Sequence, residues 1–303
     1  MYINCKQVVK AYRVSDHEIV ALRGIDFTME RGEMVAIIGP SGAGKSSLMN
    51  LLGGLDSPTA GKLTVDNQDL LALKGRKLAD YRLRQVGFVW QQVERNLLPH
   101  RTALANVTLP MMMAGMPIWK RRQRARELLR AVGLEDHMRK KPAQLSGGQQ
   151  QRIAIAVALA NEPHLLLADE PTGALDRQTA VQIMDLIGEL RQKYGLTILM
   201  VTHDMAMAAY ADRILTLRDG ALGQDLSDFG NPSGSKIDDD GRIRLPDAVK
   251  SHLDGADRIA VEIRPEGVLL RPEVDEEDDT HALLQDMLPQ KEKRGIFRRR
   301  KKS

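Results

Sequence analysis

One short stretch near the amino terminus has the residue types and spacing needed to bind phosphate. Residues 39–46 read GPSGAGKS and match G-x-x-x-x-G-K-[ST], directly after a predicted strand and before a predicted helix. The glycines let backbone N–H groups converge on phosphate oxygens, and the helix start adds the positive end of its dipole. Lys45 would reach the β- and γ-phosphates of a nucleotide, and Ser46 would ligate Mg²⁺. The predicted nucleotide-binding loop consists of Gly39, Pro40, Ser41, Gly42, Ala43, Gly44, Lys45, Ser46 and Ser47.

Two adjacent carboxylates supply the acidic chemistry. Residues 165–170 read LLLADE, an apolar run that ends in Asp169 and Glu170. On a parallel sheet the carboxyl end of such a strand faces the ligand crevice, beside the phosphate loop. We expect Asp169 to hold Mg²⁺, directly or through water, and Glu170 to polarise the attacking water as a general base. Taken alone, an apolar run followed by Asp-Glu usually marks a strand that ends at solvent, so the catalytic interpretation depends on the phosphate loop.

These motifs require a scaffold in which several strand ends meet. Compact apolar runs without alternation, as in strands buried on both faces, alternate with segments whose apolar residues recur at helical spacing. This order predicts an α/β fold with a mostly parallel sheet and crossover helices. The predicted strands cover residues 33–38, 165–168 and 197–201, and the predicted helices cover residues 119–132, 149–160 and 177–193.

A second glycine motif, LSGGQQQR, covers residues 145–152. Ser146, Gly147 and Gly148 stand at a predicted helix start, which makes them a second candidate anion site. No lysine follows, so this motif cannot complete a nucleotide site alone. The structural alternative is a simple serine N-cap with flanking glycines.

The sequence LSGGQQQR resembles the signature of ABC ATPases. The resemblance extends over residues 1–222 and implies a P-loop NTPase fold of ABC type. It also implies that Ser146, Gly147, Gly148 and Gln149 cap the γ-phosphate held by the phosphate loop of a second copy. Two chains would then pack head to tail around two ATP molecules.

Further residues match the family in order and spacing. The resemblance implies that Gln91, in GFVWQQ, touches Mg²⁺ and the attacking water, and that His203, in MVTHD, contacts the γ-phosphate. Asp176, in ALD, would lie in the loop that crosses to the second copy. Tyr12 would stack on adenine, although a tyrosine on a strand packs in the core equally often, so both roles stay open. The implied catalytic residues are Lys45, Gln91, Glu170 and His203, and the implied metal ligands are Ser46, Gln91 and Asp169.

Longer stretches resemble one branch of the family, which comprises the lipoprotein-releasing, macrolide-export and cell-division ATPases. They read LGGLDSPTAG (52–61), ADYRLRQVGFVWQQ (79–92), NVTLP (106–110) and LADEPTGALD (167–176). The resemblance implies a subunit that powers export, lipoprotein extraction or mechanotransmission through a permease with a large extracytoplasmic domain. The alternative is a soluble ABC ATPase with a regulatory or DNA-associated role through its carboxyl-terminal segment.

An apolar cluster follows Gln91 and is suited to receive a short partner helix. Core packing of a helical subdomain explains it equally well. The cluster consists of Met111, Met112, Met113, Met116 and Trp119.

The predicted organisation is an ATPase domain over 1–224, with a helical subdomain at about 92–160, and a linker over 225–236. Residues 237–273 predict strand, helix, strand, turn and strand, and resemble the swapped-hairpin dimer domain of bacterial transition-state regulators and antitoxins. Aspartates offset its basic residues, so DNA binding is not expected and a dimerisation or regulatory role is favoured. The charged tail, 274–303, ends in a basic run that could contact anionic lipid or remain a solvated tail.

The composition restricts the setting. Cys5 is the only cysteine, which precludes an internal disulfide and fits a reducing compartment. No apolar run approaches the ~18 residues of a membrane span, and no signal segment opens the chain. The net charge of +4 does not by itself indicate nucleic acid. We therefore expect a cytoplasmic protein that lies peripherally on the inner face of the cell membrane.

Overall fold

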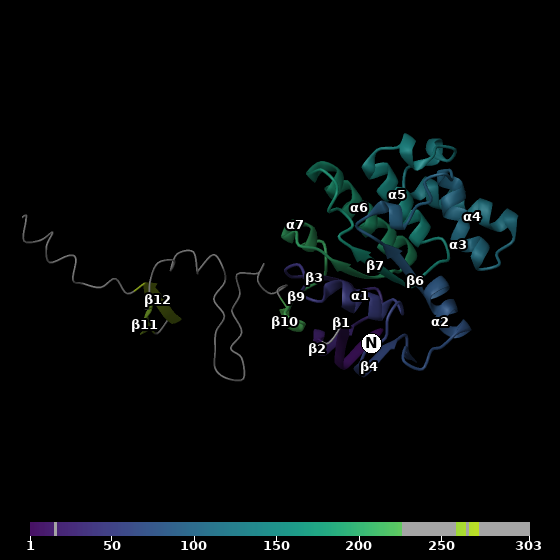
Figure 1. Ribbon diagram of the computed structural model, residues 1–303. Coiled ribbons are helices and arrows are strands. Elements are labelled where there is room, and N and C mark those ends of the chain that lie inside the picture. The colour runs from purple at the N-terminus through teal and green to yellow at the C-terminus, as the bar shows by residue number, and fades with distance from the viewer. Residues whose placement is uncertain (15–16, 226–258, 265–266, 273–303) are drawn as a thin grey trace, which may run out of the picture. The chain divides into compact units, whose positions relative to one another are not determined.

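The computed structural model describes residues 1–14, 17–225, 259–264 and 267–272 (Figure 1). The chain divides into two units, Met1–Pro232 and Ser233–Ser303, which are described separately.

A six-stranded sheet forms the centre of the first unit, in the order β10-β9-β3-β8-β7-β6. All neighbours pair in parallel except β9 and β10, which are antiparallel. This confirms the predicted α/β class with a mostly parallel sheet. The strands are β3 (Met34–Ile38), β6 (Val86–Val89), β7 (Leu165–Asp169), β8 (Thr197–Val201), β9 (Arg213–Arg218) and β10 (Ala221–Asp225).

The central strands lack alternating polarity because both of their faces are buried. In β3, Met34 and Ala36 pack into one hydrophobic core, while Val35 and Ile37 pack into a second core on the opposite face. β7 and β8 divide their side chains in the same way. Strands covered on both faces read as continuous apolar runs, which is why the sequence located these three within a residue at each end.

A second, antiparallel sheet packs beside the parallel one in the order β2-β1-β4-β5 and was not predicted. Its inward side chains, such as Ile3, Leu22 and Leu63, belong to the same hydrophobic core as α1 (Lys45–Leu52). This sheet therefore lies on the phosphate-loop side of the parallel sheet. Its strands are β1 (Ile3–Val14), β2 (His17–Met29), β4 (Ala60–Val65) and β5 (Gln68–Asp69).

The opposite face is covered by helices, which gather on one side of the molecule in Figure 1. α3, α4 and α5 contact one another and correspond to the predicted helical subdomain. The three helices predicted from sequence are confirmed as α4, α5 and α6. These helices are α3 (Ala103–Met113), α4 (Ile118–Ala131), α5 (Gly147–Ala158), α6 (Arg177–Tyr194) and α7 (Met205–Ala208). The short helix α2 (Arg76–Asp80) instead packs Leu78 against the core on the phosphate-loop side.

In the second unit the described residues form one antiparallel hairpin. It joins β11 (Ile259–Arg264) to β12 (Gly267–Pro272), with Ile259 opposite Pro272. These two strands agree with the two strands expected at the end of 237–273, and the expected turn between them, at residues 265–266, lies outside the described residues. The first strand and the helix of that predicted domain, the linker from residue 226 onwards and the tail over 274–303 lie outside the described residues.

Candidate active site

The phosphate loop connects β3 to α1, and its shape depends on glycine at two positions. A Cβ at Gly39 would lie 2.1 Å from the carbonyl oxygen of Leu217, so no side chain fits there. Gly44 has φ +103°, and a Cβ would lie 2.3 Å from the carbonyl oxygen of Ala21. Gly44 is also the N-cap of α1 and supplies no side-chain cap. The loop therefore exposes the helix start to a bound anion.

Lys45 folds back along this loop. Its Nζ donates hydrogen bonds to the carbonyl oxygens of Gly39 at 2.7 Å and Pro40 at 2.9 Å. These bonds hold the ammonium against the backbone of the loop that starts at Gly39. A positive charge and an uncapped helix start thus lie together, which suits a phosphate group.

Asp169, the last residue of β7, lies beside the loop. Burial chiefly, and then the charge of Glu170, raise its pKa, while the charges of Lys45 and Arg95 and the hydroxyl of Ser46 act in the lowering direction. The first predicted carboxylate therefore lies within electrostatic reach of Lys45 and Ser46 of the predicted loop. Sequence reasoning missed Arg95; its charge reaches Asp169 although it stands four residues after Gln91 with no motif of its own.

Glu170 lies where the ends of three neighbouring strands converge. Gln91 Nε2 donates to Glu170 Oε2 at 3.2 Å, and His203 Nδ1 lies 2.9 Å from Glu170 Oε1. Glu170 directly follows β7, while Gln91 and His203 follow β6 and β8 after one further residue each, and β7 lies between β6 and β8 in the sheet. Parallel pairing brings their carboxyl ends to one edge, so residues distant in sequence meet around a single carboxylate.

The backbone of Glu170 is itself unusual. Its φ is +45°, a conformation that non-glycine residues rarely adopt, and its N–H donates to the carbonyl oxygen of Val201 at 2.8 Å. The side chain is 16% exposed, whereas that of His203 is 68% exposed. The carboxylate is thus held largely out of solvent by contacts with Gln91 and His203, which is a suitable arrangement for a general base.

Tyr12 belongs to β1 of the antiparallel sheet, and this sheet brings it next to the phosphate loop. Its hydroxyl is 3.3 Å from Ser47 Oγ and 3.1 Å from Asp56 Oδ2. Lys10 Nζ lies 4.7 Å from the centroid of the Tyr12 ring and pairs with Asp56 at 2.7 Å. Lys10 and Asp56 orient the tyrosine and were missed from sequence, because only strand pairing brings them to it.

The signature residues form a separate group. Ser146 is the N-cap of α5: its Oγ accepts from the backbone N–H of Gln149 at 3.3 Å, and Gln149 Oε1 accepts from the backbone N–H of Ser146 at 3.1 Å. A Cβ at Gly148 would lie 2.5 Å from Thr179 Cγ2, so α5 and α6 start close together. Among the described residues, no hydrogen bond joins Ser146 to the phosphate loop.

Asp176 caps the neighbouring helix, α6. Its two carboxylate oxygens accept from the backbone N–H of Thr179 at 3.0 Å and from its hydroxyl at 2.6 Å. These bonds lower the pKa of Asp176. In one chain, therefore, Asp176 and Ser146 use their side chains to cap their own helices.

The predicted apolar cluster is divided between core and surface. Met111 is fully buried in α3 and Met116 packs against the same core, while Met112, Met113 and Trp119 are 44%, 68% and 63% exposed. A cavity of about 220 Å³ opens beside them. Its lining includes apolar and basic side chains, namely Leu104, Leu109, Met112, Ile118, Arg121 and Arg122.

A family model described as "ABC transporter" matches residues 22–173. The chain belongs to the ABC transporter family. As a member of that family it is an ATP-binding and ATP-hydrolysing subunit of a transporter. No described helix of this ABC subunit is both long and apolar enough to cross a membrane.

Two relatives and one solved structure indicate the branch of the family to which the chain is similar. The lipoprotein-releasing system ATP-binding protein LolD of Idiomarina loihiensis is 44% identical over 220 residues, 73% of this chain and 96% of the relative. The macrolide export ATP-binding/permease protein MacB 2 of Aeromonas hydrophila is 47% identical over 223 residues, 74% of this chain but 34% of the relative. A dimeric ATP-binding cassette in a post-hydrolysis state with ADP and Pi is 43% identical, with a TM-score of 0.68, covering 74% of this chain and 97% of that one.

These comparisons support an ABC ATPase close to the LolD and MacB branch. They give no support to a soluble, DNA-associated ATPase or to the antitoxin-like domain expected near the carboxyl terminus.

Proposed function

We propose that this ABC subunit hydrolyses Mg²⁺-ATP at the phosphate loop and the adjoining strand ends, and that the cycle drives a membrane permease. The observation that carries the proposal is the convergence of Gln91 and His203 on the two carboxylate oxygens of Glu170, at 3.2 and 2.9 Å. A carboxylate held in this way beside a phosphate loop is suited to activate water against a γ-phosphate.

ATP binding begins at the loop. Lys45 would exchange its hydrogen bonds to the Gly39 and Pro40 carbonyls for bonds to phosphate oxygens, so no N–H donor of its ammonium group would be left unpaired by the exchange. The uncapped start of α1 supplies further N–H donors and the favourable end of its dipole. The ring of Tyr12, tied to the loop through Ser47, provides a flat apolar surface for adenine.

The residues at the loop fit Mg²⁺. Ser46 and Asp169 both offer hard oxygen atoms to a metal ion and lie close enough for Ser46 to affect the pKa of Asp169, and Gln91 follows the strand next to that of Asp169. No cluster of three or more His, Cys, Asp or Glu residues that could hold a metal ion occurs in the described part of the chain. Mg²⁺ that accompanies a nucleotide needs only one or two protein carboxylates, because phosphates and waters complete its shell. When bound, it would neutralise charge on the β- and γ-phosphate oxygens.

Water is activated by Glu170. Its carboxylate would accept a proton from the attacking water, and Gln91 would orient that water from the neighbouring strand end. His203, hydrogen-bonded to Glu170 and largely exposed, would contact the γ-phosphate and hold the carboxylate in position.

A second copy completes each site. Ser146, Gly147, Gly148 and Gln149 would cap the γ-phosphate bound by the partner copy, and Asp176 would cross the same interface. The dimeric state of the solved cassette with ADP and Pi supports this arrangement. Full ATPase activity in a protein held monomeric would contradict it.

The permease is proposed to be an integral membrane protein with a large extracytoplasmic domain, which places the ATPase on the inner face of the cell membrane. The names of the LolD and MacB relatives support export or lipoprotein extraction as the work performed. The exposed side chains of Met112, Met113 and Trp119 are the proposed docking surface. Contact of the basic tail with anionic lipid stays a prediction, since residues 274–303 lie outside the described residues.

The deciding experiment uses tagged Glu170→Gln protein, purified in detergent with ATP. We expect this variant to bind ATP, to lose turnover by about a hundredfold or more, and to trap a dimer. Mass spectrometry should then identify a co-purifying permease with a large external domain. Normal turnover would remove Glu170 from its role as base, and a clean homodimer without membrane protein would contradict the transport assignment.

The docking surface has its own test. Met112→Glu is expected to abolish recovery of the permease while ATP binding stays normal, because a charge replaces an exposed apolar contact. Leu71→Glu, at a similarly exposed apolar residue after β5, is the control. Equal loss of the permease in both variants would refute the proposed surface.

A further inference from the structure

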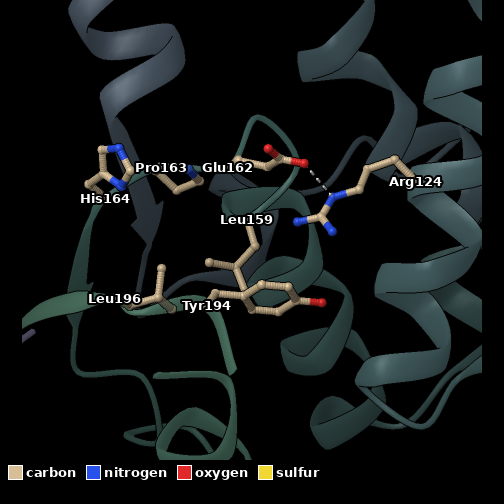
Figure 2. A pocket seen from close by; sticks show the side chains of 7 residues that line it. All are labelled: Arg124, Leu159, Glu162, Pro163, His164, Tyr194 and Leu196. Atoms are coloured by element: carbon tan, nitrogen blue, oxygen red, sulfur yellow. Dashed lines mark ion pairs between the residues drawn. The ribbon is translucent and has the colours of Figure 1, made fainter. Parts of the chain in front are cut away.

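A cavity of about 340 Å³ lies at the amino-terminal ends of β7 and β8, opposite the ends that carry Asp169 and His203 (Figure 2). Its volume is at the lower limit of ordinary small-molecule sites, which begin at roughly 300 Å³. Three apolar side chains form part of the wall, namely Leu159, Pro163 and Leu196. None of its lining residues takes part in the proposed ATPase chemistry.

Arg124 supplies the main polar group of this cavity. It extends from α4, and its side chain is only 16% exposed. Its Nε is buried and has no hydrogen-bond partner among the described residues. The guanidinium carbon lies 5.0 Å from the centroid of the Tyr194 ring, so the tyrosine supports one side of the group. In Figure 2 the guanidinium extends between Glu162 and Tyr194.

Glu162 only weakly satisfies this arginine. Its Oε1 lies 3.5 Å from Arg124 Nε, which is an ion pair but not a hydrogen bond. The side chain of Glu162 is 70% exposed and can turn into solvent without losing a buried contact. A buried guanidinium N–H without an acceptor is unfavourable in free energy. An acid that accepts a hydrogen bond from it would remove this cost, and its binding would be favoured to that extent.

We propose that this cavity binds a small molecule that carries one carboxylate or phosphate group on an apolar body. The acid would pair with the guanidinium of Arg124 in place of Glu162, since the planar fork of arginine matches both kinds of anion. The apolar body would lie against Leu159 and Leu196. The ligand would connect α4 of the helical subdomain to the loops that precede β7 and β8, and would stabilise the fold by binding only the folded state.

The test uses hexanoate and hexyl phosphate as probes and 1-hexanol as the neutral control. Binding is measured by saturation-transfer NMR and by the shift in thermal unfolding temperature on the full chain. We expect at least one acid to bind at millimolar concentration and to raise the unfolding temperature, and 1-hexanol to do neither. Comparison of the two acids decides between the carboxylate and the phosphate.

Substitutions then locate the binding. Arg124→Gln is expected to weaken binding of the acid by about tenfold or more, because a charge-assisted pair is lost. Arg126→Gln, at an exposed arginine on the same helix, is the matched control and is expected to bind as wild type. If Arg124→Gln does not fold, as judged by ATP binding, Arg124→Lys replaces it and is expected to weaken binding because the fork is lost.

Three outcomes would overturn the proposal. They are equal binding of 1-hexanol and the acids, unchanged binding in the Arg124 variants, and no binding of either acid. Each can occur with normal ATP turnover, so this test is independent of the proposed ATPase mechanism.

Discussion

Two glycine-containing helix starts in this protein are built in opposite ways. At the start of α1 the N-cap is Gly44, which has no side chain to offer and holds a backbone conformation that glycine alone adopts easily. At the start of α5 the N-cap is Ser146, which forms a reciprocal capping box with Gln149. One helix start is left open, and the other is satisfied by its own side chains.

This difference assigns different tasks to the two motifs. An uncapped start with Lys45 beside it can bind phosphate within a single chain. A capped start is stable without a ligand, by about 1 kcal/mol for the cap, and has no lysine of its own. It is therefore suited to a phosphate that is already bound elsewhere, which is what a second copy would bring.

The largest expected effect comes from the open start. Lys45→Ala should weaken ATP binding by about a hundredfold or more, because the charge and its hydrogen bonds to phosphate are both lost. Fluorescent-nucleotide titration measures this. Lys62→Ala, at an exposed lysine on β4, serves as the control and should bind normally. Near-normal ATP binding by Lys45→Ala would show that the loop does not act as the phosphate site.

The next largest effect distinguishes the start of α5 from the start of α1. Ser146→Arg should abolish turnover while each monomer still binds ATP within about twofold of wild type, since the open start is untouched. Single-turnover assays together with nucleotide titration under monomeric conditions check this. If ATP binding by the monomer fell along with turnover, the assignment of Ser146 to a partner's nucleotide would be wrong.

A milder substitution at the same residue measures the cap itself. Ser146→Ala should lower the free energy of unfolding by about 1 kcal/mol through loss of the α5 cap. Urea denaturation monitored by circular dichroism gives the value. Unchanged stability would mean that the capping box contributes nothing, and the contrast with Gly44 would then lose its energetic basis.

The smallest expected effect is a pH dependence of stability that comes from Asp176, the N-cap of α6. The pKa of Asp176 is lowered from 3.8 by its hydrogen bonds to Thr179, so its contribution to stability is present above pH 3.8 and is lost as pH falls through the lower folded-state pKa. Asp176→Asn keeps an N-cap but cannot titrate. The denaturation midpoint of wild type should exceed that of Asp176→Asn at pH 7, and the difference should shrink below pH 3.8. A pH-independent difference would contradict this origin.

Sequence reasoning was most accurate where one physical requirement dominates. The buried strands β3, β7 and β8 were located because strands covered on both faces have no polar positions. The phosphate loop was located because Gly39 and Gly44 cannot be replaced without collision. The antiparallel sheet was missed, because β1 and β2 alternate irregularly and contain register shifts in their pairing.

Residue types and spacing alone therefore determined the α/β class, the phosphate loop and the candidate base, Glu170. These follow from local rules of burial and backbone conformation, which act along the chain. Only the tertiary structure decided that Gln91 and His203 meet on Glu170 and that Tyr12 reaches Ser47. It also decided that Arg124 lines a cavity at the other end of the sheet with its Nε lacking a hydrogen bond. Those contacts join segments far apart in sequence, and strand order and sheet packing, which no local pattern encodes, bring them together.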